Sequence, residues 1–213
     1  MYIDLQHRSP LWSNTKSIFP YYTSLMIPTR EQAHSILENW VENINLRKHM
    51  YCVEAAMRAY AEKYGEDADK WGIAGLLHDA DWEKYPDEHP AQIVAKLSAE
   101  GVDEELVHAI ASHGNNSEQY GERFAERSTL IDRALFACDE LCGFIVACSL
   151  VRPSGIDDLA PKSAKKKLKD KAFAAQVSRD DIYQGAEELG VDLTEHIQFV
   201  IDAIRGVKDR VFA

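Results

Sequence analysis

Residues 71–79 read WGIAGLLHD, a short apolar segment that ends in the pair His78-Asp79. Trp71, Leu77 and His78 fall on one helical face, and the polar run that follows Asp79 marks the end of the helix. A buried imidazole is costly unless it is hydrogen-bonded or binds a metal. The segment therefore predicts a helix that ends at His78-Asp79. A single His-Asp pair also arises by chance in a chain of this composition, so its placement among other ligand-type residues decides its meaning.

The segments before this pair also show the period of an amphipathic helix. Thr29 and Gln32 match a capping box, and apolar residues follow at helical spacing as far as Ile44. The next helix carries His49 on its apolar face, and Gly65 supplies a stop signal. We therefore expect His49 to point into the protein interior.

The remainder of the chain continues the helical pattern. Pro90 suits the first turn of a helix that runs to Gly101, and Asp103 caps the next helix. His89 and His113 therefore bracket a helical hairpin. Further helices are expected over residues 130–150, after Ser163, from Ser178 and from Asp192. Nothing in the chain alternates convincingly as strands do, so the sequence predicts an all-α fold.

Length and composition indicate one folded domain. The chain has 213 residues, of which 46% are hydrophobic and 28% are charged, as in an ordinary globular protein with a single core. Residues 1–27 differ, with prolines and aromatics but no helical period. They are expected to form an N-terminal arm or extension that precedes a single domain over residues 28–213.

Charge and cysteine content exclude several classes of protein. The net charge of -11 argues against general nucleic-acid binding, which requires clustered lysine and arginine to neutralise phosphates. Four cysteines without a CxxC pair predict reduced thiols rather than a disulfide scaffold. No stretch reaches the roughly 18 apolar residues of a membrane helix, and the amino end lacks a signal-peptide pattern. We expect a soluble cytoplasmic protein without a membrane partner.

Residues of the ligand type recur on apolar helix faces. His49, His78 and Asp139 each fall on the apolar side of a different helix, where an uncompensated polar group is unfavourable. Any one of them alone is more simply explained as a hydrogen-bonded core residue. Together they favour a metal site, because inward side chains of crossing helices can converge on one point.

The residue types also restrict the chemistry. Imidazole and carboxylate ligands without thiolate suit one or two divalent ions of Mn, Fe, Co, Ni or Zn. Two such ions about 3.5–4 Å apart can activate a water and stabilise charge on a phosphoryl oxygen. The sequence therefore favours metal-dependent hydrolysis of a phosphoester in a small metabolite or nucleotide.

The same order of residues resembles a known family. A histidine, then a His-Asp pair preceded by Gly-Leu-Leu, then a distant aspartate are similar to the HD-domain metal-dependent phosphohydrolases. The motifs His89-Pro90 and Ala111-Ser112-His113 resemble the subset that holds two metals. The resemblance covers about residues 45–150 and implies an HD-type helical bundle with appended C-terminal helices.

The resemblance also implies a set of ligands. Asp79 would bridge two ions, the second of which is completed by His89 and His113. The residues implied for the first ion are His49, His78, Asp79 and Asp139. Gly114-Asn115-Asn116 follows His113, where cyclic-dinucleotide phosphodiesterases of the family have a different motif, and this argues against their activity.

Two further features have two interpretations each. Asp81 could orient the nucleophilic water or position a ligating histidine, or it is a solvated loop acid. The basic cluster after residue 161 is either a solvated helix face or a binding site for the substrate phosphate. The residues proposed to bind the phosphate are Lys162, Lys165, Lys166, Lys169 and Arg179. Four histidines without supporting context are expected at the surface: His7, His34, His108 and His196.

Two alternative functions stay open. One is a dinuclear-iron oxygenase of the HD type, and the other is a non-catalytic HD module that binds a ligand for regulation. All expected ligand types are present, which favours an enzyme over the second alternative. The loop over residues 114–127 is expected to contribute to specificity, but no motif identifies the substrate or the oligomeric state.

Overall fold

The computed structural model describes residues 26–116 and 121–212 and shows ten α-helices there, without a β-strand. An isolated bridge joins Met26 to Val102. The helices are α1 (Arg30–Trp40), α2 (Ile44–Tyr64), α3 (Ala68–Leu77), α4 (Ala91–Ala99), α5 (Glu104–Ala111), α6 (Leu130–Leu150), α7 (Pro161–Leu168), α8 (Arg179–Leu189), α9 (Leu193–Gly206) and α10 (Lys208–Val211). The all-α class predicted from the sequence is confirmed.

The helix boundaries follow from local capping chemistry. Thr29 and Gln32 form both hydrogen bonds of the capping box at the start of α1. Gly65 ends α2 in the left-handed conformation, with φ 76°, which glycine adopts without strain. The first helix was expected to reach Ile44, but Val41 is extended and the Asn43 side chain caps a new helix there. The short helix α10 was not predicted.

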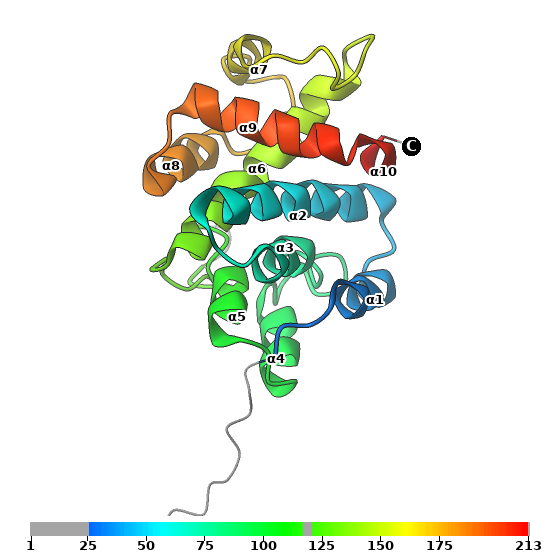
Figure 1. Cartoon of the computed structure of the whole chain (residues 1–213), viewed down its shortest axis with the longest axis vertical. Coiled ribbons are helices and arrows are strands. Elements are labelled where there is room, and N and C mark those ends of the chain that lie inside the picture. Colours follow the sequence, from blue (N-terminus) through cyan, green and yellow to red (C-terminus); the bar gives the residue numbers. More distant parts are fainter. Residues whose placement is uncertain (1–25, 117–120, 213) are drawn as a thin grey trace, which may run out of the picture.

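The helices pack on both sides of α2 (Figure 1). Figure 1 shows α2 and α9 side by side across the middle of the molecule, with α6 crossing behind them. Helices α1, α3, α4 and α5 lie on one side of α2, and α7, α8 and α9 lie on the other. No helix in the described ranges is long and apolar enough to cross a membrane.

Close helix contacts position the end of α3. A Cβ atom on Gly75 would lie 2.9 Å from the backbone carbonyl of Val53 in α2, so only glycine allows the two helices to approach this closely. Gly185 has the same role between α8 and α6, because a Cβ there would lie 2.6 Å from Cα of Ala137. The contact at Gly75 brings the last turn of α3, with His78, against α2, which carries His49.

The prediction that His196 is a surface residue is wrong. Its ring is fully buried between α2 and α6, with Nδ1 2.6 Å from the Tyr60 hydroxyl and Nε2 2.9 Å from the carbonyl oxygen of Ala137. The carbonyl can only accept, so Nε2 donates to it and the hydroxyl donates to Nδ1. The steps of four from His196 to Val200 and Ile204 already placed this ring on the apolar stripe of its helix.

The other expectations about the amino end and the surface histidines have different outcomes. His34 and His108 are partly exposed. His34 contacts Tyr51 and Glu38, and His108 contacts Asp132. His7 and residues 1–25 of the expected arm lie outside the described residues. The division into an arm and one domain over residues 28–213 stays a prediction. Within the described part, Met26 makes two backbone hydrogen bonds to the turn between α4 and α5.

Candidate metal centre

Six predicted ligand residues come together beside α2. His49 lies in α2, His78 caps the end of α3, and Asp79 follows it. His89 precedes α4, His113 follows α5, and Asp139 lies in α6. Two groups of three have ligand atoms close enough to hold an ion, and Asp79 belongs to both. The first group adds His49 and His78 to Asp79, and the second adds His89 and His113.

Asp139 lies beside the first group, and the rings of His49 and His78 face one oxygen of Asp139 and one of Asp79. Oδ1 of Asp139 lies 3.0 Å from Nε2 of His49 and 3.3 Å from Nε2 of His78. Oδ2 of Asp79 lies 3.5 Å from Nε2 of His78 and 3.9 Å from Nε2 of His49. These four side chains therefore direct two nitrogens and two oxygens toward one small region.

The second group uses the other oxygen of Asp79. Oδ1 of this carboxylate lies 3.5 Å from Nε2 of His89 and 3.5 Å from Nε2 of His113. The two Nε2 atoms are themselves 3.1 Å apart. The carboxylate of Asp79 therefore stands between the two groups, with one oxygen directed to each.

Backbone carbonyls fix the tautomer of two histidine rings. Nδ1 of His78 donates to the carbonyl oxygen of Gly75 at 2.9 Å, and Nδ1 of His113 donates to that of Ile110 at 2.6 Å. In a neutral ring the other nitrogen, Nε2, then carries a lone pair. Nε2 of His78 is buried and has no hydrogen-bond partner among the described residues. A metal ion would satisfy this lone pair.

Asp81 fixes the third ring. Its buried carboxylate accepts from Nδ1 of His89 at 2.6 Å through Oδ1, and from the backbone N–H groups of Gln92 and Ile93 through Oδ2. This leaves the lone pair of His89 Nε2 facing that of His113. Two lone pairs at this distance repel each other unless a cation lies between them. The donor set therefore fits a bound cation, and Asp81 has the geometry of a positioning residue.

Burial and charge also shift the pKa values in this cluster. Burial lowers the pKa of His78, but the carboxylates of Asp79 and Asp139 outweigh it and raise the pKa to about 9. Burial raises the pKa of both aspartates, but neighbouring histidines, His78 first, hold each well below its ordinary range. A proton on His78 is therefore the counter-charge that a metal ion would displace.

The two groups open into a cleft of about 350 Å³. Sequence reasoning missed most of its wall, which includes Trp82, Phe136, Glu140, Gln176 and Asp181. Burial, and then the charge of Asp139, raise the pKa of Glu140 to about 8. The loop expected to contribute to specificity does reach the cleft, through Gly114, Asn115 and Phe124. No lysine or arginine is among the described residues that line it.

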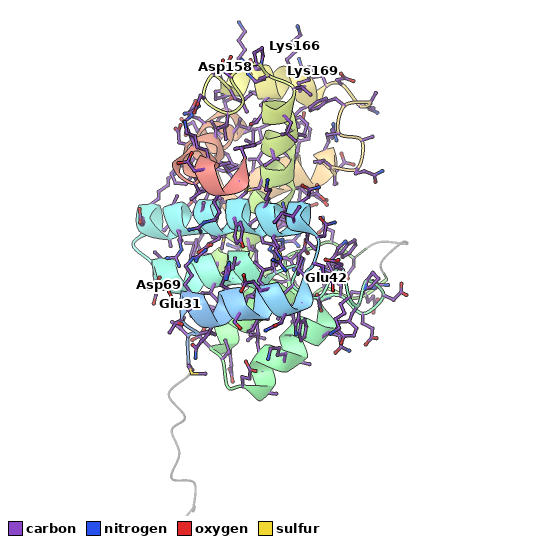
Figure 2. All side chains as sticks on the ribbon, turned by 90° about the vertical axis from the view of Figure 1, so that its right-hand side faces the viewer. Glu31, Glu42, Asp69, Asp158, Lys166 and Lys169 are labelled. Atoms are coloured by element: carbon purple, nitrogen blue, oxygen red, sulfur yellow. The ribbon has the colours of Figure 1, made fainter. Side chains whose placement is uncertain are left out.

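The basic residues predicted to bind the substrate phosphate do not line this cleft. Figure 2 shows Lys166 and Lys169 at the α7 end of the molecule, where α7 packs against α9. Nζ of Lys165 donates to the hydroxyl of Thr194 in α9, at 2.7 Å. The Arg179 guanidinium donates to the backbone carbonyl oxygens of residues 170–177. Lys162 is also absent from the described wall of the cleft.

Comparison with known proteins identifies the domain. A family model described as HD domain matches residues 46–142, a range that contains all six clustered residues. Neither the curated proteins nor the solved structures gave a match to the chain. Both the residue order and the helical fold agree with the family. The chain therefore carries an HD domain over residues 46–142.

Proposed function

We propose that this protein is a metal-dependent phosphohydrolase that cleaves a phosphoester of a small metabolite or nucleotide. The observation that carries the proposal is the position of the Asp79 carboxylate, with one oxygen directed to each group of histidines. Two divalent ions bound there would lower the pKa of water and would neutralise charge on phosphoryl oxygens. The HD-domain match over residues 46–142 and the resemblance of the residue order to HD-domain phosphohydrolases support the same reaction class.

In this proposal each side chain has a distinct role. His49, His78 and Asp139 would hold the first ion, and His89 and His113 would hold the second. Asp79 would contribute a ligand to each ion, and Asp81 keeps the ring of His89 in the orientation and tautomer that ligation needs. Trp82 and Phe124 each form a T-shaped ring pair with His89, which is buried.

The charge of the cleft makes phosphate binding depend on metal. Asp79, Asp139 and Asp181 line the cleft, and their carboxylates would repel an anionic substrate. Bound cations reverse this local charge. We therefore expect a metal-free protein to lose phosphate binding as well as turnover.

The proposal is tested by metal analysis followed by a substrate screen. Protein purified without chelator is expected to contain about one to two transition ions per chain. Chelation should abolish hydrolysis of the phosphorylated metabolite found in the screen, and one of Mn, Fe, Co, Ni or Zn should restore it. Less than about 0.1 ion per chain after reconstitution with each metal would contradict the proposal.

The same experiment separates the two alternative functions. The nitrogen and oxygen donor set also accepts iron, so an oxygenase would show bound iron with an electron-spin signal and consumption of dioxygen. A regulatory module would bind metal and phosphorylated ligands without turning any of them over. Hydrolysis restored by a redox-inactive ion such as zinc excludes both.

Asp81→Asn should weaken the second ion selectively. The amide has only one acceptor oxygen, so it cannot accept hydrogen bonds from both the His89 ring and the N-terminus of α4, as the two oxygens of the carboxylate do. The affinity for the ion at Asp79, His89 and His113 should fall about 10- to 100-fold, with the first ion retained. Calorimetric metal titration measures both sites, and Asp87→Asn, an exposed acid of the same loop, is the control. Equal affinities in Asp81→Asn and wild type would contradict the positioning role.

A further inference from the structure

A second, larger cavity adjoins the metal cleft. It has a volume of about 920 Å³ and lies between the first turns of α2, the end of α6 and the chain around residues 208–212. Its wall shares two residues with the metal cleft, His49 and Gly143. The two cavities therefore meet at a residue of the metal centre.

Gly143 has no packing reason to be a glycine. It lies inside α6, where glycine destabilises a helix relative to alanine. At Gly75 and Gly185 an added Cβ would lie within 3 Å of a neighbouring backbone, whereas at Gly143 the nearest atom is Nδ1 of His49 at 3.9 Å. The missing side chain leaves open space at the junction of the two cavities. A large residue there would narrow the junction.

The larger cavity differs from the metal cleft in charge. Lys48, Arg152 and Lys208 line it, with two aspartates, whereas only acidic charged groups and histidines line the metal cleft among the described residues. Ion pairs hold two of the cations at the wall, because Arg152 donates to Asp158 and Lys208 donates to Asp157. Apolar side chains complete the wall: Val146, Leu150, Ile156, Val211 and Phe212.

We propose that this larger cavity binds the leaving-group half of the substrate, which passes Gly143 while its phosphate lies at the metal centre. The substrate is then an elongated phosphoester whose organic half is partly apolar and carries an anionic group at its far end. The volume is in the range of sites for small organic ligands, about 300–1,000 Å³. This inference rests on the proposed phosphohydrolase function.

Binding of phosphonates to the Mn²⁺-loaded protein tests the inference without turnover. Methylphosphonate fills only the metal cleft, hexylphosphonate adds an apolar chain, and 7-phosphonoheptanoate adds a terminal carboxylate. By calorimetry, hexylphosphonate should bind at least about tenfold more tightly than methylphosphonate, because binding transfers its apolar chain from water into the cavity. The carboxylate should add a further gain of about fivefold, as a charge-assisted contact does.

Two variants separate the parts of the cavity. Gly143→Leu should remove the tenfold gain of the longer chain, measured as the ratio of hexylphosphonate to methylphosphonate affinity within the variant. Gly206→Leu, at the exposed end of α9 where an added side chain meets open space, is its control. Lys208→Met should remove only the gain from the carboxylate. Lys96→Met, which breaks a comparable surface ion pair with Glu100, is the control for that loss.

The outcomes distinguish this inference from the function on which it rests. If methylphosphonate fails to bind the Mn²⁺-loaded protein, the proposed function fails. If methylphosphonate binds but the longer ligands bind no better, or if Gly143→Leu keeps their full gain, the cavity is not the leaving-group site. If the terminal carboxylate of 7-phosphonoheptanoate does not increase the affinity, or if Lys208→Met keeps that increase, the far end of the substrate is not anionic.

Discussion

Asp79→Ala is expected to empty the whole metal centre and to lower kcat/KM for the phosphoester by at least about a thousandfold. The reason is geometric, because the two oxygens of this carboxylate face different groups of histidines. Its removal would take one ligand from each ion site and the negative charge that lies between the two sites. Elemental analysis and steady-state kinetics on the same preparation measure the two effects together.

His113→Ala is the informative comparison for this prediction. The ring of His113 faces only Oδ1 of Asp79 and the ring of His89, so its loss should release mainly the second ion. Asp87→Ala, in the exposed part of the loop after Asp79, should keep metal and activity. Full occupancy in Asp79→Ala, or complete loss of both ions in both variants, would contradict a bridging carboxylate.

Acid should destabilise the fold through His196 by about 3 kcal/mol. Burial lowers the pKa of this ring from 6.5 to about 4, although its hydrogen bond to Ala137 opposes the shift. The unfolded chain therefore binds a proton more readily than the folded protein does. The contribution to stability is complete above pH 6.5, falls as the pH decreases, and is lost below about pH 4.

Urea unfolding of wild type and His196→Gln at several pH values isolates this contribution. The pKa of His78 is shifted as well, so the relevant quantity is the difference between the two proteins. The variant should be less stable at pH 7, because glutamine cannot replace the ring between Tyr60 and Ala137. Its stability should depend less steeply on pH below 6.5. Parallel pH profiles would show that His196 does not govern this dependence.

Local signals predicted the helices well. The side chains of Thr29, Ser178 and Asp192 cap helices as expected, and Gly65 ends one. Helical periodicity also placed His49 on an inward face, because a buried stripe needs only the sequence of its own helix. The boundary between α1 and α2 was missed because apolar spacing continued through the Asn43 cap.

What could not be predicted depends on packing between distant segments. The basic cluster of α7 could be placed only once the packing of α7 against α9 was known. The partner of Asp81 depended on the path of the loop back to His89, which no periodicity specifies. Gly143 gave no signal at all, since its importance lies in the space around it. The ligand types were accessible from sequence, but the walls of the cavities were not.

The carboxylate of Asp81 also joins metal binding to the integrity of α4. One oxygen orients His89 and the other accepts from the first N–H groups of that helix, so α4 cannot open locally without releasing the ring. An ion held by His89 would bind the closed form alone and would shift this opening equilibrium by mass action. Metal occupancy would then set how often α4 opens away from the core.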